Sequence, residues 1–264
     1  GETPPPATPG RVRAAQPVGA TAILQDVGVS FLSEYADVSI GQFKNPLSLE
    51  GVGSSSKLLF PERSLVSRAF GDRRDLGVKA EKKLGAFAYT LGLFNGAGQN
   101  KLDTNDQKDL ALRLEVYPFK GLTAALVGYA AAFDREEAGT RDRIEADLKI
   151  EKYDALLQAE YILGWDKGAE RRVEGHGFYV AAGYTFFDKL QPIARIGGLD
   201  PDVDNNTNGA TSDPDDEVTH YELGANYYFN SHEAKLQLAG GFFDPQQAES
   251  PTHFELTLAA QVSF

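Results

Sequence analysis

The sequence predicts an all-β fold, a transmembrane antiparallel up-and-down β-barrel, and three features support that prediction. Apolar and polar residues alternate with a period of two over most of the chain. The alternating stretches are about ten to thirteen residues long, whereas strands of soluble proteins average about five or six. The connections between them alternate between short and long, which is typical of barrels in bacterial outer membranes.

The composition narrows the class of protein. The chain has 264 residues, no Cys, no Met and a formal net charge of -12. Without Cys, disulfides and thiolate metal sites are excluded. The acidic balance argues against nucleic acid as a partner, since a phosphate backbone requires basic stripes. No stretch approaches the roughly 20 apolar residues of a membrane helix, but a barrel needs apolar residues only at alternate positions. A chain without Met that opens at Gly1 is expected to be the mature form of an exported protein.

The period of two is clearest in residues 252–264. Apolar residues occupy every second position there, and mostly polar residues occupy the positions between. In a strand these two sets point to opposite faces of the sheet. The same split recurs in residues 108–118, 141–152 and 217–229. A helical period would mix charged residues into the apolar stripe, so these segments are predicted to be strands.

The strand count follows from the pattern and from parity. The tight turn after the first alternating strand places the end of that strand on the periplasmic side, so another strand must precede it, and only residues 11–20 are available. This gives fourteen strands, because bacterial single-chain barrels have even numbers, and twelve and sixteen are the alternatives. Residues 1–10 are predicted to be a Pro-rich tail, and residues 11–264 a single barrel domain. The other expected strands are 23–32, 35–44, 73–82, 85–95, 108–118, 121–133, 141–152, 154–165, 174–187, 189–199, 217–229, 233–243 and 252–264.

The connections and the aromatic residues predict which rim of the barrel carries the tight turns and which carries the long loops. Aromatic residues such as Tyr35, Tyr153 and Phe187 lie near tight connections, and Trp165 and Phe243 lie near long ones. Girdles of this kind mark the two membrane interfaces of a barrel. Tight connections are expected near Ser33-Glu34, Lys83-Leu84, Phe119-Lys120, Tyr153, Asp188 and Ser231, and long ones at residues 45–72, 95–107, 134–140, 166–172, 200–216 and 244–251.

Two segments resemble known outer-membrane proteins. Residues 41–46 read Gly-Gln-Phe-Lys-Asn-Pro, and residues 60–63, after a Ser-rich stretch, read Phe-Pro-Glu-Arg. This pattern resembles the phosphate-selective porin O and P family, of which the chain would be a shortened member. The resemblance implies that Lys44 and the Glu62-Arg63 pair lie in the constriction of a pore. The C-terminal strand resembles the signal that the barrel-assembly machinery recognises, and its residues are Phe254, Leu256, Leu258, Val262 and Phe264.

The long connection at residues 45–72 is the leading candidate for the functional site. Its length is unusual for a connection and predicts a loop that folds inward or covers the mouth of the barrel. Rings of Arg and Lys in a pore lower the barrier for anions. Two alternatives stay open: Glu62 and Arg63 form an ion pair that anchors the loop, and inward charges of both signs pair into a crosslinked wall with weak selectivity. The pore candidates are Lys44, Glu62, Arg63, Arg68, Arg73, Arg74, Arg113, Arg143, Lys149 and Arg195.

Calcium and catalysis are the two other chemistries that the sequence raises. Asp200, Asp202 and Asp204 place carboxylates at alternate positions, as the opening of a calcium loop does, although a solvated acidic loop has the same appearance. No cofactor is otherwise expected. The four histidines have no metal spacing, and the nearest approach to a catalytic pair is His220 with Asp215 or Asp216. The chain is therefore predicted not to be an enzyme.

The predicted function is passive diffusion of small hydrophilic solutes, including anions such as phosphate, through a porin integral to the Gram-negative outer membrane. A plugged scaffold barrel that binds a partner protein is the alternative. A hydrocarbon transporter would require an apolar lumen, which the charged inward faces argue against. The expected partners are outer-membrane lipid, lipopolysaccharide, the barrel-assembly machinery, the solutes, and further copies of the chain or a partner protein.

Overall fold

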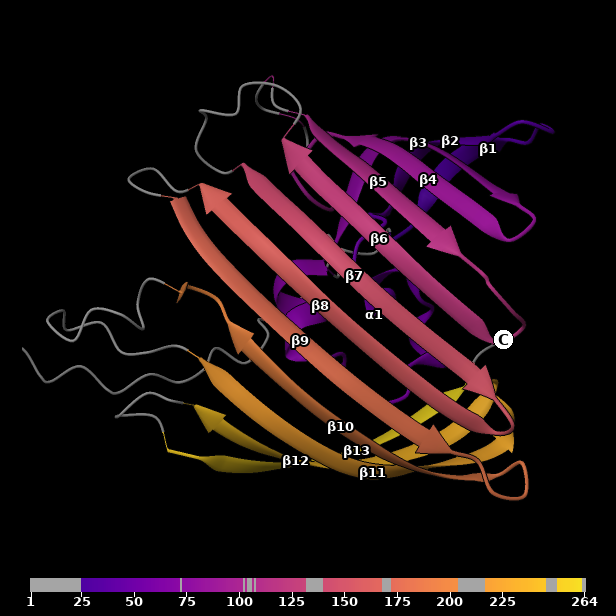
Figure 1. Cartoon of the computed structure of the whole chain (residues 1–264), viewed down its shortest axis with the longest axis vertical. Helices are drawn as coiled ribbons and strands as arrows, with labels where there is room; N and C mark the ends of the chain where they lie inside the picture. Colours follow the sequence, from indigo (N-terminus) through magenta and orange to yellow (C-terminus); the bar gives the residue numbers. More distant parts are fainter. Residues whose placement is uncertain are drawn as a thin grey trace, which may run out of the picture.

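The computed structural model is a single curved sheet of antiparallel strands in which every strand pairs with its neighbours in sequence (Figure 1). The structure describes residues 25–71, 73–101, 103, 106, 108–131, 140–167, 172–203, 217–245 and 251–262. The predicted all-β, up-and-down architecture is confirmed. The strands are β1 Val27–Phe31, β2 Asp37–Lys44, β3 Arg74–Leu84, β4 Phe87–Phe94, β5 Asp109–Val116, β6 Leu122–Ala131, β7 Arg141–Lys152, β8 Ala155–Lys167, β9 Arg172–Tyr184, β10 Leu190–Asp200, β11 Val218–Asn230, β12 Ala234–Pro245 and β13 His253–Val262.

The described part of the chain contains thirteen strands, which match the thirteen expected from alternation. The expected strand at residues 11–20 lies outside the described residues, as does the tail at residues 1–10. One predicted tight turn lies two residues further along the chain: Lys83 and Leu84 end β3, and Gly85 and Ala86 form the turn that follows. The two edges of the sheet are β1 and β13, and the described residues contain no pairing between them.

The two faces of the sheet differ as the alternation predicts. Outward residues are apolar and exposed, as Leu223 is at 70%. Inward positions carry buried charged residues such as Arg113, Glu145 and Arg195, and Glu145 is 0% exposed. In water this arrangement would expose a continuous apolar band, whereas in a bilayer it places apolar side chains in lipid.

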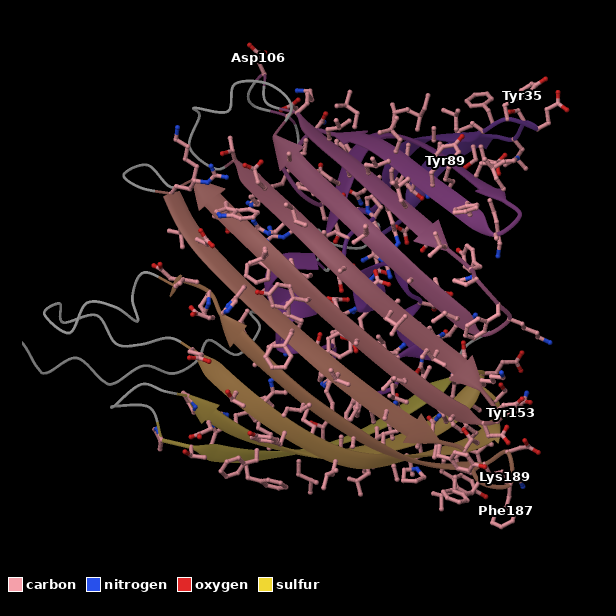
Figure 2. The ribbon with its side chains drawn as sticks, in the orientation of Figure 1. Tyr35, Tyr89, Asp106, Tyr153, Phe187 and Lys189 are labelled. Carbon is pink, nitrogen blue, oxygen red and sulfur yellow. The ribbon has the colours of Figure 1, made fainter. Side chains whose placement is uncertain are left out.

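Several tight turns use left-handed backbone at residues other than glycine. Tyr153 and Asp154 both have positive φ, 51° and 64°, between the paired residues Lys152 and Ala155. Two consecutive left-handed residues form the turn whose twist matches an antiparallel hairpin. The aromatic side chains of Tyr153 and Phe187 are exposed, and Figure 2 labels both at the same rim, with Lys189 between them. Asp106 lies at the opposite rim (Figure 2).

The connection between β2 and β3 folds into the lumen and is referred to as the inner segment, residues 45–71. It contains a short helix α1 Leu49–Val52, a 3₁₀ turn η1 Ser55–Lys57 and a π turn η2 Ser67–Gly71. Figure 1 shows α1 within the curve of the sheet, behind β7 to β9. Among the described residues, no helix has both the length and the apolar character that a membrane crossing requires.

Candidate functional site

Near the start of the inner segment, two wall carboxylates hold a strained residue in place. Ser48 has φ of 66°, and its backbone N–H donates to Glu145 at 2.6 Å. The next N–H, that of Leu49, donates to Glu160 at 2.6 Å. The Ser48 hydroxyl also donates to Glu160, at 3.0 Å. Carboxylates that accept backbone N–H groups make strong hydrogen bonds, so β7 and β8 fix the point at which the segment enters the lumen.

A buried arginine from β10 holds the middle of the segment. Arg195 lies 3.3 Å from the Glu50 carboxylate, and donates to the backbone carbonyl of Glu62 at 3.1 Å. It also pairs with Glu222 on β11. The guanidinium therefore joins two places in the segment to two neighbouring strands.

Polar side chains from β11 and β12 bind the carbonyls of Leu58 and Leu59. Lys235 donates to the Leu58 carbonyl at 2.7 Å, and Asn226 donates to the Leu59 carbonyl at 2.9 Å. Gln237 donates to the Leu59 carbonyl at 3.2 Å and also to the side-chain oxygen of Asn226. Because buried backbone carbonyls require partners, these three side chains are the reason why an irregular segment can be buried here.

An apolar cluster completes the attachment of the segment to the wall. Phe60, Val66 and Phe70 of the segment pack with wall residues that include Ile162 and Tyr179. Phe60 and Val66 are completely buried, and full burial of such a side chain contributes about 1.5–3 kcal/mol. Hydrogen bonds at the start and middle and apolar packing toward the end make the segment a fixed part of the lumen.

The opposite side of the segment leaves open space. A cavity of about 830 Å³ lies between residues 61–69 and the inner faces of β10 to β13. Glu62, Arg63 and Arg68 reach it from the segment, and Glu222 and Glu255 reach it from the wall. Arg68 is exposed, and among the described residues no ion pair involves it. The candidate site is therefore this cavity, with cations and carboxylates on its walls.

The structure brings four of the predicted pore residues to this cavity, namely Glu62, Arg63, Arg68 and Arg195. Arg63 also donates to the carbonyl of Glu50 at 3.1 Å, so that it helps to shape the segment. Lys44 lies at the end of β2 and donates to the carbonyl of Gly53. Arg74 is the first residue of β3, where it pairs with the exposed Asp26 at 3.1 Å.

The other predicted pore residues have acidic partners on the wall. Arg113 lies 2.8 Å from both Glu115 and Asp147. Arg143 pairs with Asp166 at 2.5 Å, and its guanidinium lies over the Phe70 ring. Lys149 pairs with Glu151 at 2.8 Å. The contacts of Arg113 with Asp147 and of Arg143 with Asp166 join different strands, as in the crosslinked wall that inward charges of both signs suggest, whereas the other two pairs lie within one strand.

Arg73 contacts the end of the inner segment and lies within the electrostatic field of arginines on β7. Its guanidinium donates to the carbonyl of Ala69 at 3.2 Å. Burial lowers the pKa of Arg73, and the nearby charges of Arg141 and Arg143 lower it further. The opposing charge of Asp166 acts in the other direction. The positive charges of Arg141 and Arg143 on β7 therefore act on Arg73 from the wall.

Most residues that hold the inner segment were not singled out from the sequence. Ser48, Glu50 and Asn226 are polar residues of ordinary appearance in the sequence, and alternation identifies Glu160 and Lys235 only as inward charges. Asn and Gln at inward positions of β11 and β12 are the one signal that could have identified part of this set. A lumen filled only with water does not require amide side chains there, so their presence indicates backbone groups that need hydrogen-bond partners.

Neither calcium binding nor catalysis gains a described site. Asp200 and Asp202 are buried, and the backbone N–H of Asp202 donates to Asp200 at 3.2 Å. Asp204 lies outside the described residues, and so do Asp215 and Asp216. Within the described part of the chain, no group of three His, Asp or Glu side chains is arranged to hold a metal. Calcium at Asp200, Asp202 and Asp204 stays a prediction.

The curved sheet, its lipid-facing belt and a lumen narrowed by an inward segment define an outer-membrane porin fold. A family model described as phosphate-selective porin O and P matches residues 10–140, which confirms the resemblance seen at residues 41–63. The chain is an integral protein of the outer membrane. None of the curated proteins matches the sequence.

Solved structures of several outer-membrane proteins share this fold. OmpT of Vibrio cholerae is 15% identical, with a TM-score of 0.62 over 88% of this chain and 78% of that protein. The anion-selective porin from Comamonas acidovorans is 13% identical, with a TM-score of 0.58 over 89% of this chain and 72% of that protein. OccK5 of Pseudomonas aeruginosa is 11% identical, with a TM-score of 0.55 over 88% of this chain and 69% of that protein.

Proposed function

We propose that the protein is a porin through which small hydrophilic solutes diffuse, and that anions such as phosphate are among them. The observation that supports this most directly is the cavity between the inner segment and β10 to β13, with Arg68 exposed on its wall. A cation in a narrow, water-filled passage lowers the barrier for anions. Passive diffusion requires no catalytic group, and the proposal is that the protein is not an enzyme.

Selectivity can be tested on Arg68 without weakening the attachment of the segment. In a planar bilayer under a salt gradient, the wild type is expected to show open steps and a reversal potential that favours anions. Arg68→Gln should move that potential toward cations because one lumen charge is lost. Arg172→Gln is the control: it removes the same charge from an exposed arginine on the outer side of β9.

Two results would contradict the proposal. Silence from folded, inserted protein would favour the plugged scaffold barrel, since the segment already fills one side of the lumen. An equal shift with Arg68→Gln and Arg172→Gln would mean that overall surface charge, and not the passage, sets the preference.

The partners proposed from the fold are those of an outer-membrane barrel. The outward ladder Phe254, Leu256, Leu258 and Val262 is exposed on β13, which suits both lipid contact and recognition by the barrel-assembly machinery. Phe264 lies outside the described residues. Contact with lipopolysaccharide at the long-loop rim is part of the proposal. One related structure is described as a trimer form of OmpT of Vibrio cholerae, and we propose that this chain also assembles with copies of itself.

A further inference from the structure

Three aromatic rings form a continuous stack across neighbouring strands of the passage wall. The rings of His220 on β11 and Phe243 on β12 have centroids 5.6 Å apart and planes inclined by 14°. Those of Phe243 and His253 on β13 are 5.3 Å apart and inclined by 12°. His220 pairs with Phe243, and Phe243 with His253, in the strand register. We refer to these three residues as the ring stack, and all three line the cavity.

Glycines give the stack its place on the wall. A Cβ atom at Gly197 would lie 2.4 Å from Cε1 of His220, and a Cβ at Gly241 would lie 2.7 Å from Cε2 of Phe243. Both distances are too short for a Cβ atom. The rings can therefore occupy this space only because positions 197 and 241 are glycine. The stack is therefore built into the wall and is more than three aromatic residues that happen to be near one another.

The ring stack contains hydrogen-bonding groups that have no partner among the described residues. His220 is 1% exposed, and among the described residues neither of its ring nitrogens has a hydrogen-bond partner. Its Nε2 is 3.6 Å from Glu222, which is beyond hydrogen-bonding distance. At the other end of the stack, the His253 side chain is 44% exposed. A buried imidazole without partners requires an explanation, and among the described residues no further ring packs on the His253 end of the stack, at the edge strand β13.

Charge around the same cavity is distributed unevenly. The wall carboxylates have cationic or imidazole neighbours, since Glu222 pairs with Arg195 and Glu255 lies 3.5 Å from His253. Across the cavity, Glu62, Arg63 and Arg68 come from the inner segment, so that cations outnumber carboxylates there by two to one, and Glu62 and Arg68 are both exposed. The remaining lining is largely apolar, with Leu65, Leu199 and Val218 among its residues.

From this geometry we propose that the passage contains a binding subsite for small planar aromatic carboxylates. The aromatic ring packs against the ring stack and the apolar lining, and the carboxylate faces the guanidinium of Arg68. Aromatic pairs contribute beyond their buried area, and a guanidinium matches a carboxylate in shape and charge. The subsite rests on the proposed function, because it lies on the same diffusion path.

The test is current block by matched probes in single-channel recordings of the full chain. Benzoate is compared with cyclohexanecarboxylate, which has a ring and a charge of the same kind but no aromatic face. Benzoate is expected to bind more tightly by about twofold to tenfold, the range that aromatic pairs supply. Phe243→Leu should remove this preference, and Phe242→Leu, whose side chain faces lipid, should retain it. Arg68→Gln should weaken both carboxylates alike.

The outcomes separate this inference from the proposed function. Normal conductance in plain salt with equal block by the two carboxylates would overturn the subsite and leave the porin intact. Stronger block by benzylammonium than by benzoate would also overturn it, because Glu62 would then be the charged contact. If the protein does not conduct, equilibrium dialysis of the same probes with folded protein in detergent gives the same comparison. Loss of benzoate binding in Phe243→Leu, with binding retained in Phe242→Leu, would then support the subsite.

Discussion

Arg195 on β10 contacts two parts of the molecule that are far apart in sequence, the inner segment and β11. Its guanidinium meets Glu50 and the carbonyl of Glu62 in the inner segment, and Glu222 on β11. Arg195 and Glu50 are both almost completely buried. A buried carboxylate that loses its cation is left uncompensated, which is why such pairs are more harmful to break than they are favourable to form.

The first prediction concerns this pair. Arg195→Gln should lower the free energy of unfolding by about 3 kcal/mol, measured by urea titration in lipid vesicles. Glu50→Gln added to it should recover part of that loss, since the uncompensated charge is then removed. The control is Arg172→Gln, which breaks an exposed pair with Asp142 and should change stability by less than about 1 kcal/mol. Equal effects of the two arginine substitutions would contradict the assigned role of Arg195.

At the scale of elements, the inner segment is closed on itself as well as attached to the wall. The hydroxyls of Ser48, near its start, and Ser67, near its end, are 2.8 Å apart. This contact ties the two ends of the loop together inside the lumen. Because the chain has no Cys, a disulfide can be introduced at this point without competing thiols.

The second prediction follows from that contact. Ser48→Cys combined with Ser67→Cys should oxidise readily and stabilise the protein by about 3 kcal/mol relative to its reduced form, as expected for a loop of this length. Single-channel conductance should be the same in both redox states if the segment is a fixed constriction. Reduction that opens a larger conductance state would show instead that the segment moves as a gate.

The features that the sequence predicts depend on a local pattern, whereas those that it does not predict depend on contacts between distant residues. Strands and their faces followed from alternation, because burial on one side only imposes a period of two. The attachment of the segment did not follow from any local pattern. Ser48 and Glu145 are 97 residues apart, and Glu50 and Arg195 are 145 apart. Alternation identifies Glu145 and Arg195 as inward residues, but not which of the inward charges meets the segment.

At the scale of the whole molecule, the two edge strands determine how the barrel closes. β1 and β13 both run toward the tight-turn rim, since β1 precedes such a turn and β13 follows a long connection. Direct pairing between them would be parallel, whereas a strand from residues 11–20 between them would pair antiparallel with both. The second arrangement preserves an even strand number, which is the rule for bacterial single-chain barrels.

The third prediction tests that arrangement with cysteines. Single cysteines at successive positions of residues 11–20, each combined with Leu258→Cys on β13, should form disulfides in the folded protein at the position opposite Leu258. Yields should alternate with a period of two, because successive residues of a strand face opposite sides. Mass spectrometry of the oxidised protein after denaturation identifies the pairs. The comparison is Val29→Cys on β1 with Leu258→Cys, which should stay reduced if a strand separates β1 from β13. A disulfide in that pair, with none from residues 11–20, would instead establish a barrel of thirteen strands closed by a parallel pair.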